Sequence, residues 1–119
     1  MRNVFVRADN IISPLGRNTA GNIEALKKGD SGIRAHHSPL SENPFYASLL
    51  GPEAKTGDPG LSAFENIAFA SAAEALKGQD IVLSGPRTGF ILSSTKGNIS
   101  IIEGNGPVNE EDVGLGSSA

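Results

Sequence analysis

The side chains in this sequence that could carry chemistry are few, and they do not combine into a catalytic set. Ser31 lies in a Gly-Asp-Ser-Gly sequence, but a nucleophilic serine needs a base that the fold brings close to it. The only two histidines, His36 and His37, follow within six residues in the same irregular stretch. A helix end followed by a turn explains the glycines around Ser31 better than a nucleophile does. We therefore predict no catalytic residue in this chain.

Metal and cofactor binding find no better support. Adjacent residues of an extended chain point in opposite directions, so His36 and His37 are more simply interpreted as polar loop residues than as metal ligands. No cysteine is present to complete a site. Residues 114–119 formally match the glycine fingerprint of dinucleotide-binding proteins, but they follow acidic residues instead of a strand, so coincidence is the simpler explanation. The sequence thus predicts no metal and no cofactor.

Composition excludes some broad classes. The chain has 119 residues, enough for one compact core that buries roughly two-thirds of the unfolded surface. A formal net charge of −3 argues against a nucleic-acid partner, which requires a basic face. The longest apolar stretch, residues 67–76, is interrupted by Ser71 and Glu74 and is too short to span a membrane. No targeting signal is visible, so we expect a cytoplasmic location.

The N-terminal third predicts a strand, a tight turn and a short helix. Apolar residues alternate and then continue through residues 3–12, which is typical of a strand. The Ser-Pro-Leu-Gly sequence at residues 13–16 ends it, because proline cannot donate to a strand ladder. Thr19 can cap a helix, and Gly29 stands where a left-handed residue ends one.

The strongest helix prediction begins at Ser62 and ends at Lys77. Ser62 and Glu65 match a capping box, in which each side chain satisfies a backbone N–H at the helix start. Only Asn66, Glu74 and Lys77 form a polar face, so we expect this Ala-rich helix to be buried on several sides.

The remaining segments are predicted less uniformly. Residues 88–95 contain three consecutive large apolar residues, which indicates a strand buried on both faces. Four prolines make residues 33–60 irregular, with one candidate strand at 45–50. Residues 99–102 favour a strand by composition, although a helix start is an alternative. Residues 104–119 are acidic and Gly-rich, and we expect this tail to be disordered by itself.

Two motifs at matching spacing carry functional information. The sequence Ile-Ile-Ser-Pro-Leu-Gly at residues 11–16 is followed by Thr19, by the apolar pair Ile23 and Leu26, and by Gly-Asp-Ser-Gly-Ile at residues 29–33. This arrangement resembles the opening of β-ketoacyl synthases, in which a strand ends in a Ser-Pro-Leu/Ile-Gly turn and a short helix leads to Leu-x-x-Gly-x-Ser-Gly-Ile. An Ala-rich helix and an Arg-Thr-Gly-hydrophobic strand then follow in the same order.

The resemblance implies a fold class and a function. The fold would be α/β, a partial thiolase-like fold with a mixed sheet and a buried Ala-rich helix, with residues 1–103 as its N-terminal segment. The complete enzyme would be a 3-oxoacyl-acyl-carrier-protein synthase, an acyltransferase that condenses an acyl thioester with malonyl-acyl-carrier protein in fatty acid or polyketide biosynthesis. Its nucleophilic cysteine and two histidines belong to segments beyond the matched one, so this chain alone should be inactive. Implied partners are acyl-carrier protein and a second subunit, in a homodimer or heterodimer.

The resemblance also implies one substrate contact and contains two departures. In the family, a Gly-rich turn after the later strand lies near the acyl pocket, which corresponds here to Ser94, Thr95, Lys96 and Gly97. Lys96 departs from the family pattern, and it should either face solvent or meet an acidic partner, since a buried unpaired ammonium is costly. The other departure is at residues 8–10, where Ala-Asp-Asn replaces Gly-Ile/Met-Gly.

Two other interpretations of the sequence remain. The chain could be a non-catalytic ketosynthase-like partner or interaction domain, or an unrelated small α/β binding module, which the paired motifs make the least favoured. The reading frame downstream of Ala119 distinguishes the enzyme from the interaction domain: a continued frame with a Thr/Ala-Cys-Ala/Ser segment indicates an enzyme, and a stop codon favours the interaction domain.

Overall fold

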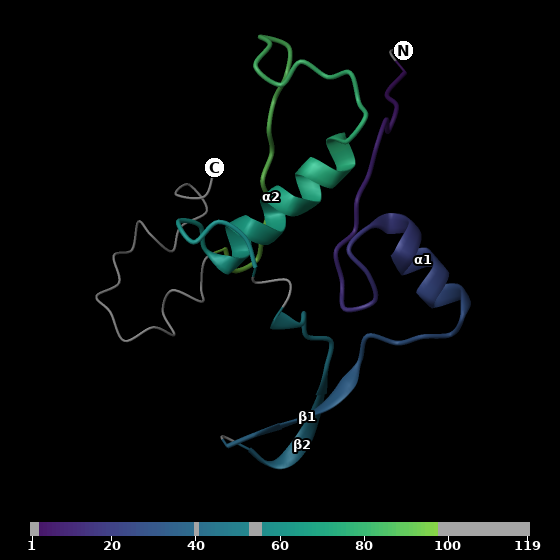
Figure 1. Cartoon of the computed structure of the whole chain (residues 1–119), viewed down its shortest axis with the longest axis vertical. Coiled ribbons are helices and arrows are strands. Elements are labelled where there is room, and N and C mark those ends of the chain that lie inside the picture. Colours follow the sequence, from purple (N-terminus) through teal and green to yellow (C-terminus); the bar gives the residue numbers. More distant parts are fainter. Residues whose placement is uncertain (1–2, 40, 53–55, 98–119) are drawn as a thin grey trace.

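The computed structural model describes residues 3–39, 41–52 and 56–97. Four elements follow in the order α1 (Thr19–Lys27), β1 (Arg34–Ser38), β2 (Ser41–Ala47) and α2 (Ala63–Leu76) (Figure 1). The chain therefore has the mixed α/β content that the sequence predicts. Its sheet within these residues, however, is a two-stranded antiparallel hairpin and not a mixed sheet. No helix in the described part of the chain is long and apolar enough to cross a membrane.

Helix α1 is defined by local signals at both ends. Asn18 caps its start, because its side-chain oxygen accepts a hydrogen bond from the backbone N–H of Gly21 at 2.8 Å. The predicted cap, Thr19, is instead the first helical residue, one position further on. At the other end Gly29 has φ +81° and donates to Leu26 O at 3.0 Å, while Asp30 N donates to Ala25 O at 3.0 Å. These two bonds form a Schellman motif, so the predicted left-handed glycine is confirmed.

The hairpin lies in a region where the sequence predicts irregular chain and only one candidate strand, at residues 45–50. Its register pairs Arg34 with Ala47 and His36 with Phe45, and it shifts between His36 and Ser38. Pro44 stands in β2 beside this irregularity, where its missing N–H costs no ladder bond. The prediction was wrong because prolines at such positions are compatible with an edge strand, and both strands of a hairpin are edges.

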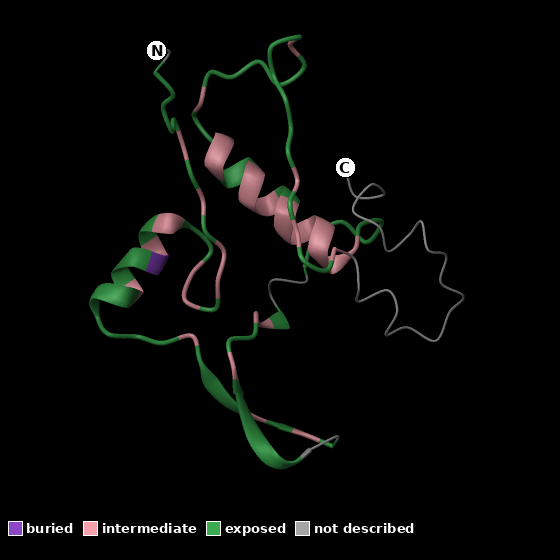
Figure 2. Ribbon diagram, turned by 180° about the vertical axis from the view of Figure 1, so that it is seen from behind, coloured by how far each residue is buried: buried purple, intermediate pink, exposed green. Residues whose placement is uncertain are grey.

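Helix α2 confirms its predicted cap but not its predicted burial. The Ser62 Oγ accepts from Glu65 N at 3.1 Å and the Glu65 carboxylate accepts from Ser62 N at 2.7 Å, which completes the capping box. The helix has no fully buried residue, and Phe69 is 70% exposed. Figure 2 shows α2 as mostly half-buried, with exposed positions along it. The expectation of a buried helix is therefore wrong for the described part of the chain, in which no layer of other elements covers α2.

The two predicted long strands are also absent. Residues 3–12 and 88–95 have no strand pairing in the structure. Phe90 and Ile91 are 71% and 92% exposed, the opposite of a strand buried on both faces. Strand propensity reflects packing against neighbours, and these segments have no neighbouring strand to pair with among the described residues. The predictions for residues 99–102 and for residues 104–119 concern segments outside the described residues.

The chain exposes more surface than a compact protein of its mass. A compact protein of 12.3 kDa exposes about 6,100 Å², whereas this chain exposes 9779 Å². Its radius of gyration is 17.4 Å, against about 13.5 Å for a compact domain of this length. Among the described elements, only β1 and β2 pack extensively on one another. Residues 3–39, 41–52 and 56–97 therefore do not form the single compact core expected from chain length.

Candidate functional site

The predicted substrate contact, residues 94–97, forms a small polar turn. The Ser94 Oγ accepts from Lys96 N at 3.3 Å and from Gly97 N at 2.9 Å, and Gly97 has φ +54°. A serine that accepts from the amides two and three residues later stabilises such a turn. Lys96 is exposed and forms no ion pair within the described residues. Of the two alternatives expected for it, facing solvent or meeting an acidic partner, the structure shows the first, which avoids the cost of burying an ammonium. The assignment of this turn to an acyl pocket stays a prediction.

The side chain of Asn22, which the sequence patterns do not single out, is buried and forms four hydrogen bonds. Asn22 is 4% exposed, and the structure shows no other buried polar residue in its described part (Figure 2). Its Nδ2 donates to Ile11 O at 3.0 Å, Gly16 O at 3.0 Å and Asn18 O at 2.8 Å. Its Oδ1 accepts from the hydroxyl of Ser13. This network fixes the turn at residues 13–16 against α1.

The same turn is closed by its own backbone. Ser13 N donates to Gly16 O at 2.9 Å, and Gly16 N donates to Ser13 O at 3.1 Å. A Cβ added at Gly16 would lie 3.1 Å from Asn22 N, so a larger residue would push the turn away from the helix. The sequence signal that could have revealed Asn22 is its place, one turn into a helix that follows a Ser-Pro-Leu-Gly turn. Polar residues at that depth often bond back to the preceding chain.

A cavity of about 350 Å³ lies where the N-terminal segment meets both helices. It is lined by Ile12, Arg17, Asn18, Ala70 and Glu74. Next to it, Asn10 Nδ2 donates to Ser71 Oγ at 3.1 Å and to Arg17 O at 3.3 Å. The polar side chains of this cavity include no nucleophile and no base paired with one. The cavity lies between the N-terminal segment and the two helices, and its lining gives no specific support for a reaction.

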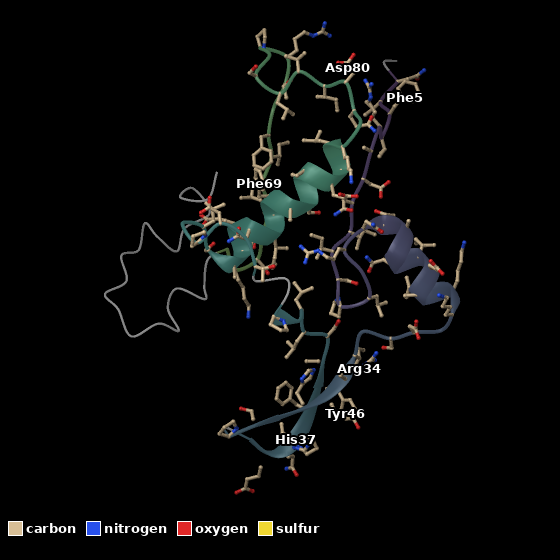
Figure 3. The ribbon with its side chains drawn as sticks, in the orientation of Figure 1. Phe5, Arg34, His37, Tyr46, Phe69 and Asp80 are labelled. Carbon is tan, nitrogen blue, oxygen red and sulfur yellow. The ribbon has the colours of Figure 1, made fainter. Side chains whose placement is uncertain are left out.

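The histidines occupy β1 and do not form a metal site. His36 stacks on Phe45 with ring centroids 5.6 Å apart, and its Nε2 lies 3.1 Å from Ala47 O. His37 is the next residue of the strand and lies further toward the tip of the hairpin (Figure 3). Within residues 3–39, 41–52 and 56–97, no group of three or more His, Cys, Asp or Glu side chains could hold a metal ion. The Ser31 Oγ accepts from Ile33 N at 3.2 Å, which is a turn contact.

No family model matches this chain, and no curated protein or solved structure matches it either. The resemblance to β-ketoacyl synthases therefore depends on the motifs quoted above. What the structure adds to them is geometric. The Ser-Pro-Leu-Gly sequence is a closed turn, a short helix follows it, and that helix ends at a left-handed glycine before Asp-Ser-Gly.

Proposed function

We propose that this chain is a scaffold segment of a β-ketoacyl synthase, the enzyme that condenses an acyl thioester with malonyl-acyl-carrier protein. The observation that carries the proposal is the unit formed by residues 11–33. Its two motifs are separated by a helix of nine residues, and the turn before the helix is bonded to it through Asn22. The motifs that resemble the family thus belong to one local structure with defined ends.

The large exposed surface supports a role as part of a larger assembly. Apolar side chains remain exposed on α2 and in the segment that follows it, including Phe69 at 70% and Val82 at 69%. Several large apolar side chains exposed in one part of the chain are compatible with a face that other protein covers. A scaffold segment of a larger α/β enzyme would have these faces packed under neighbouring elements.

The chemistry of the condensation must then come from other residues. Members of the β-ketoacyl synthase family use a cysteine nucleophile, and this sequence contains no cysteine. The proposed contribution of this chain is structural, with the turn at residues 94–97 forming part of the wall of the acyl pocket. The exposed ammonium of Lys96 would restrict the length of an acyl tail lying against that wall.

Reading the native transcript through and beyond the codon for Ala119 tests the proposal. We expect an open frame that encodes a Thr/Ala-Cys-Ala/Ser segment and two later histidines. A frame that continues without a cysteine in such a segment, or one that stops directly, would contradict the proposal.

A second candidate function is a non-catalytic ketosynthase-like partner, and one specific observation favours it. Asp9 and Asn10 stand where the family has small or apolar residues, and both are tied to neighbouring elements. The carboxylate of Asp9 accepts from the hydroxyl of Thr19, and Asn10 bonds to Ser71 of α2. The two residues that depart from the family pattern thus hold the N-terminal segment to α1 and α2. A frame that stops directly would leave this candidate in place of the first.

A further inference from the structure

We propose that a cavity at the base of the hairpin binds a small phosphate-bearing ligand through Arg34 and His36. The cavity has a volume of about 230 Å³ and is lined by Pro14, Gly32, Arg34, His36, Leu49 and Gly51. Ligand pockets for drug-sized molecules have about 300–1,000 Å³, so this one suits a head group of a few heavy atoms. The inference does not depend on the ketosynthase proposal.

The guanidinium of Arg34 is already positioned. Its Nη1 donates to the backbone carbonyl of Ser31 and, at 3.1 Å, to that of Ile33. Arginine has five N–H donors in a rigid fork, so the Nε and Nη2 groups keep three that have no partner among the described residues. Nε and Nη2 together form the edge that binds two oxygens of an oxyanion. Arg34 also forms no ion pair with a described carboxylate.

The ring of His36 is held from two sides in the same cavity lining. It stacks on Phe45, and its Nε2 donates to Ala47 O at 3.1 Å, since a carbonyl oxygen can only accept. The Nδ1 atom is therefore the nitrogen that remains for a ligand. In a neutral ring Nδ1 accepts a hydrogen bond, and in a protonated ring it donates one.

This pair of groups favours phosphate over carboxylate. Inorganic phosphate near neutral pH offers anionic oxygens to Arg34 and an O–H group that can donate to a neutral His36, and a phosphate monoester offers the same O–H group in its monoanionic form. A carboxylate offers acceptors only, so it satisfies Arg34 but leaves neutral Nδ1 facing an acceptor. The apolar side chains of Pro14 and Leu49 line the remaining wall, where the organic part of an ester would pack.

The test is a titration of the ¹⁵N-labelled chain with inorganic phosphate and, separately, with acetate, at an ionic strength held constant with chloride. We expect saturable shifts of the amides of residues 32–36 and 49–51 with phosphate. Acetate should bind at least about tenfold more weakly, because it lacks the hydrogen bond to His36. Equal affinity for acetate would overturn the phosphate assignment, and shifts that do not saturate, or spread evenly along the chain, would overturn the site.

Two variants and one control locate the binding. Arg34→Gln should weaken phosphate binding by at least about tenfold, because it removes a charged hydrogen-bond donor. Arg87→Gln makes the same change of charge in an exposed loop outside the cavity, and should change the affinity by less than about twofold. Leu49→Glu leaves the Arg34 contacts to Ser31 and Ile33 intact but places a carboxylate in the lining, and it should also abolish binding. Phosphate binding that persists in Leu49→Glu, or is lost equally in Arg87→Gln, would refute the proposal.

Discussion

Two stretches of the molecule, residues 11–29 and 58–76, are built on the same local plan but differ in what surrounds them. Each contains a helix with an asparagine at its fourth position, and the asparagine donates to the carbonyl of the capping residue. Asn22 donates to Asn18 O at 2.8 Å and Asn66 donates to Ser62 O at 3.1 Å. Both also bond to the loop before the helix. The plan therefore occurs twice in one chain.

The two asparagines differ in burial. Asn22 is 4% exposed and its other bonds reach Ile11 and Gly16, so it closes a turn and a chain segment over the helix. Asn66 is only half-buried, and its bonds to Asp58 O and Leu61 O, each 3.0 Å long, are exposed. The same local bonding thus organises tertiary structure in the first stretch and only a loop in the second. The difference between the two stretches is therefore one of burial and not of local hydrogen bonding.

The largest effect on stability is expected when the buried asparagine, Asn22, is replaced. Asn22→Leu should reduce the free energy of opening of α1 by about 2 kcal/mol, because the carbonyl of Ile11 loses its part-buried donor and the Ser13 hydroxyl loses its acceptor. Amide hydrogen exchange of residues 22–28 measures this free energy directly. Unchanged protection of these amides would show that the network around Asn22 does not stabilise the turn and helix.

The matched substitution in the second stretch should have a smaller effect. Asn66→Leu is expected to cost about 1 kcal/mol in the opening of α2, because water can replace the exposed bonds to Asp58 and Leu61. The comparison predicts a ratio of at least about two between the two asparagines. Equal losses measured by hydrogen exchange would mean that burial does not distinguish the two stretches.

The capping box gives a third test, confined to α2. Ser62→Ala should destabilise the start of the helix by about 1 kcal/mol, since Glu65 N loses its acceptor. The change should appear in the helical circular dichroism and in exchange of the first-turn amides. Ser93→Ala, an exposed serine outside the helices, is the control, and a loss as large as that of Ser62→Ala would contradict the assignment to the cap.

The features that the sequence predicts correctly are those that depend on a few neighbouring residues. The capping box of Ser62 and Glu65 and the left-handed Gly29 each need contacts within five residues, and both are confirmed. Helix α2 is predicted almost to the residue for the same reason. The Ser94 turn, with bonds to the amides two and three positions on, also agrees with the turn expected there.

The features that it fails to predict depend on partners far away in the chain. Residues 3–12 and 88–95 have strand composition but no partner strand in the part of the chain that the structure describes, so composition alone gave the wrong result. The hairpin depends on pairing Arg34 with Ala47, and its prolines concealed it. The position of Asn22, one turn into a helix, indicates a bond to nearby backbone, but it does not identify Ile11, eleven residues earlier, as a partner.

The smallest expected effect concerns the charges at the end of α1. Lys28 and Glu24 form an ion pair at 2.8 Å, with both side chains more than 60% exposed. Lys28→Ala should therefore change the stability of α1 by no more than about 0.5 kcal/mol. A much larger change in the hydrogen exchange of α1 would show that exposed charges, and not only the hydrogen bonds of Asn22, determine the stability of this helix.

The measurement that tests the central claim most directly is intact-mass analysis of the protein expressed from its native reading frame, after incubation with an acyl-acyl-carrier-protein thioester. If residues 1–119 serve as the scaffold of a β-ketoacyl synthase, one acyl group should be transferred per chain, and peptide mapping should place it on a cysteine outside these residues. A protein that acquires no acyl group, or one whose acyl group maps within residues 1–119, would contradict the account.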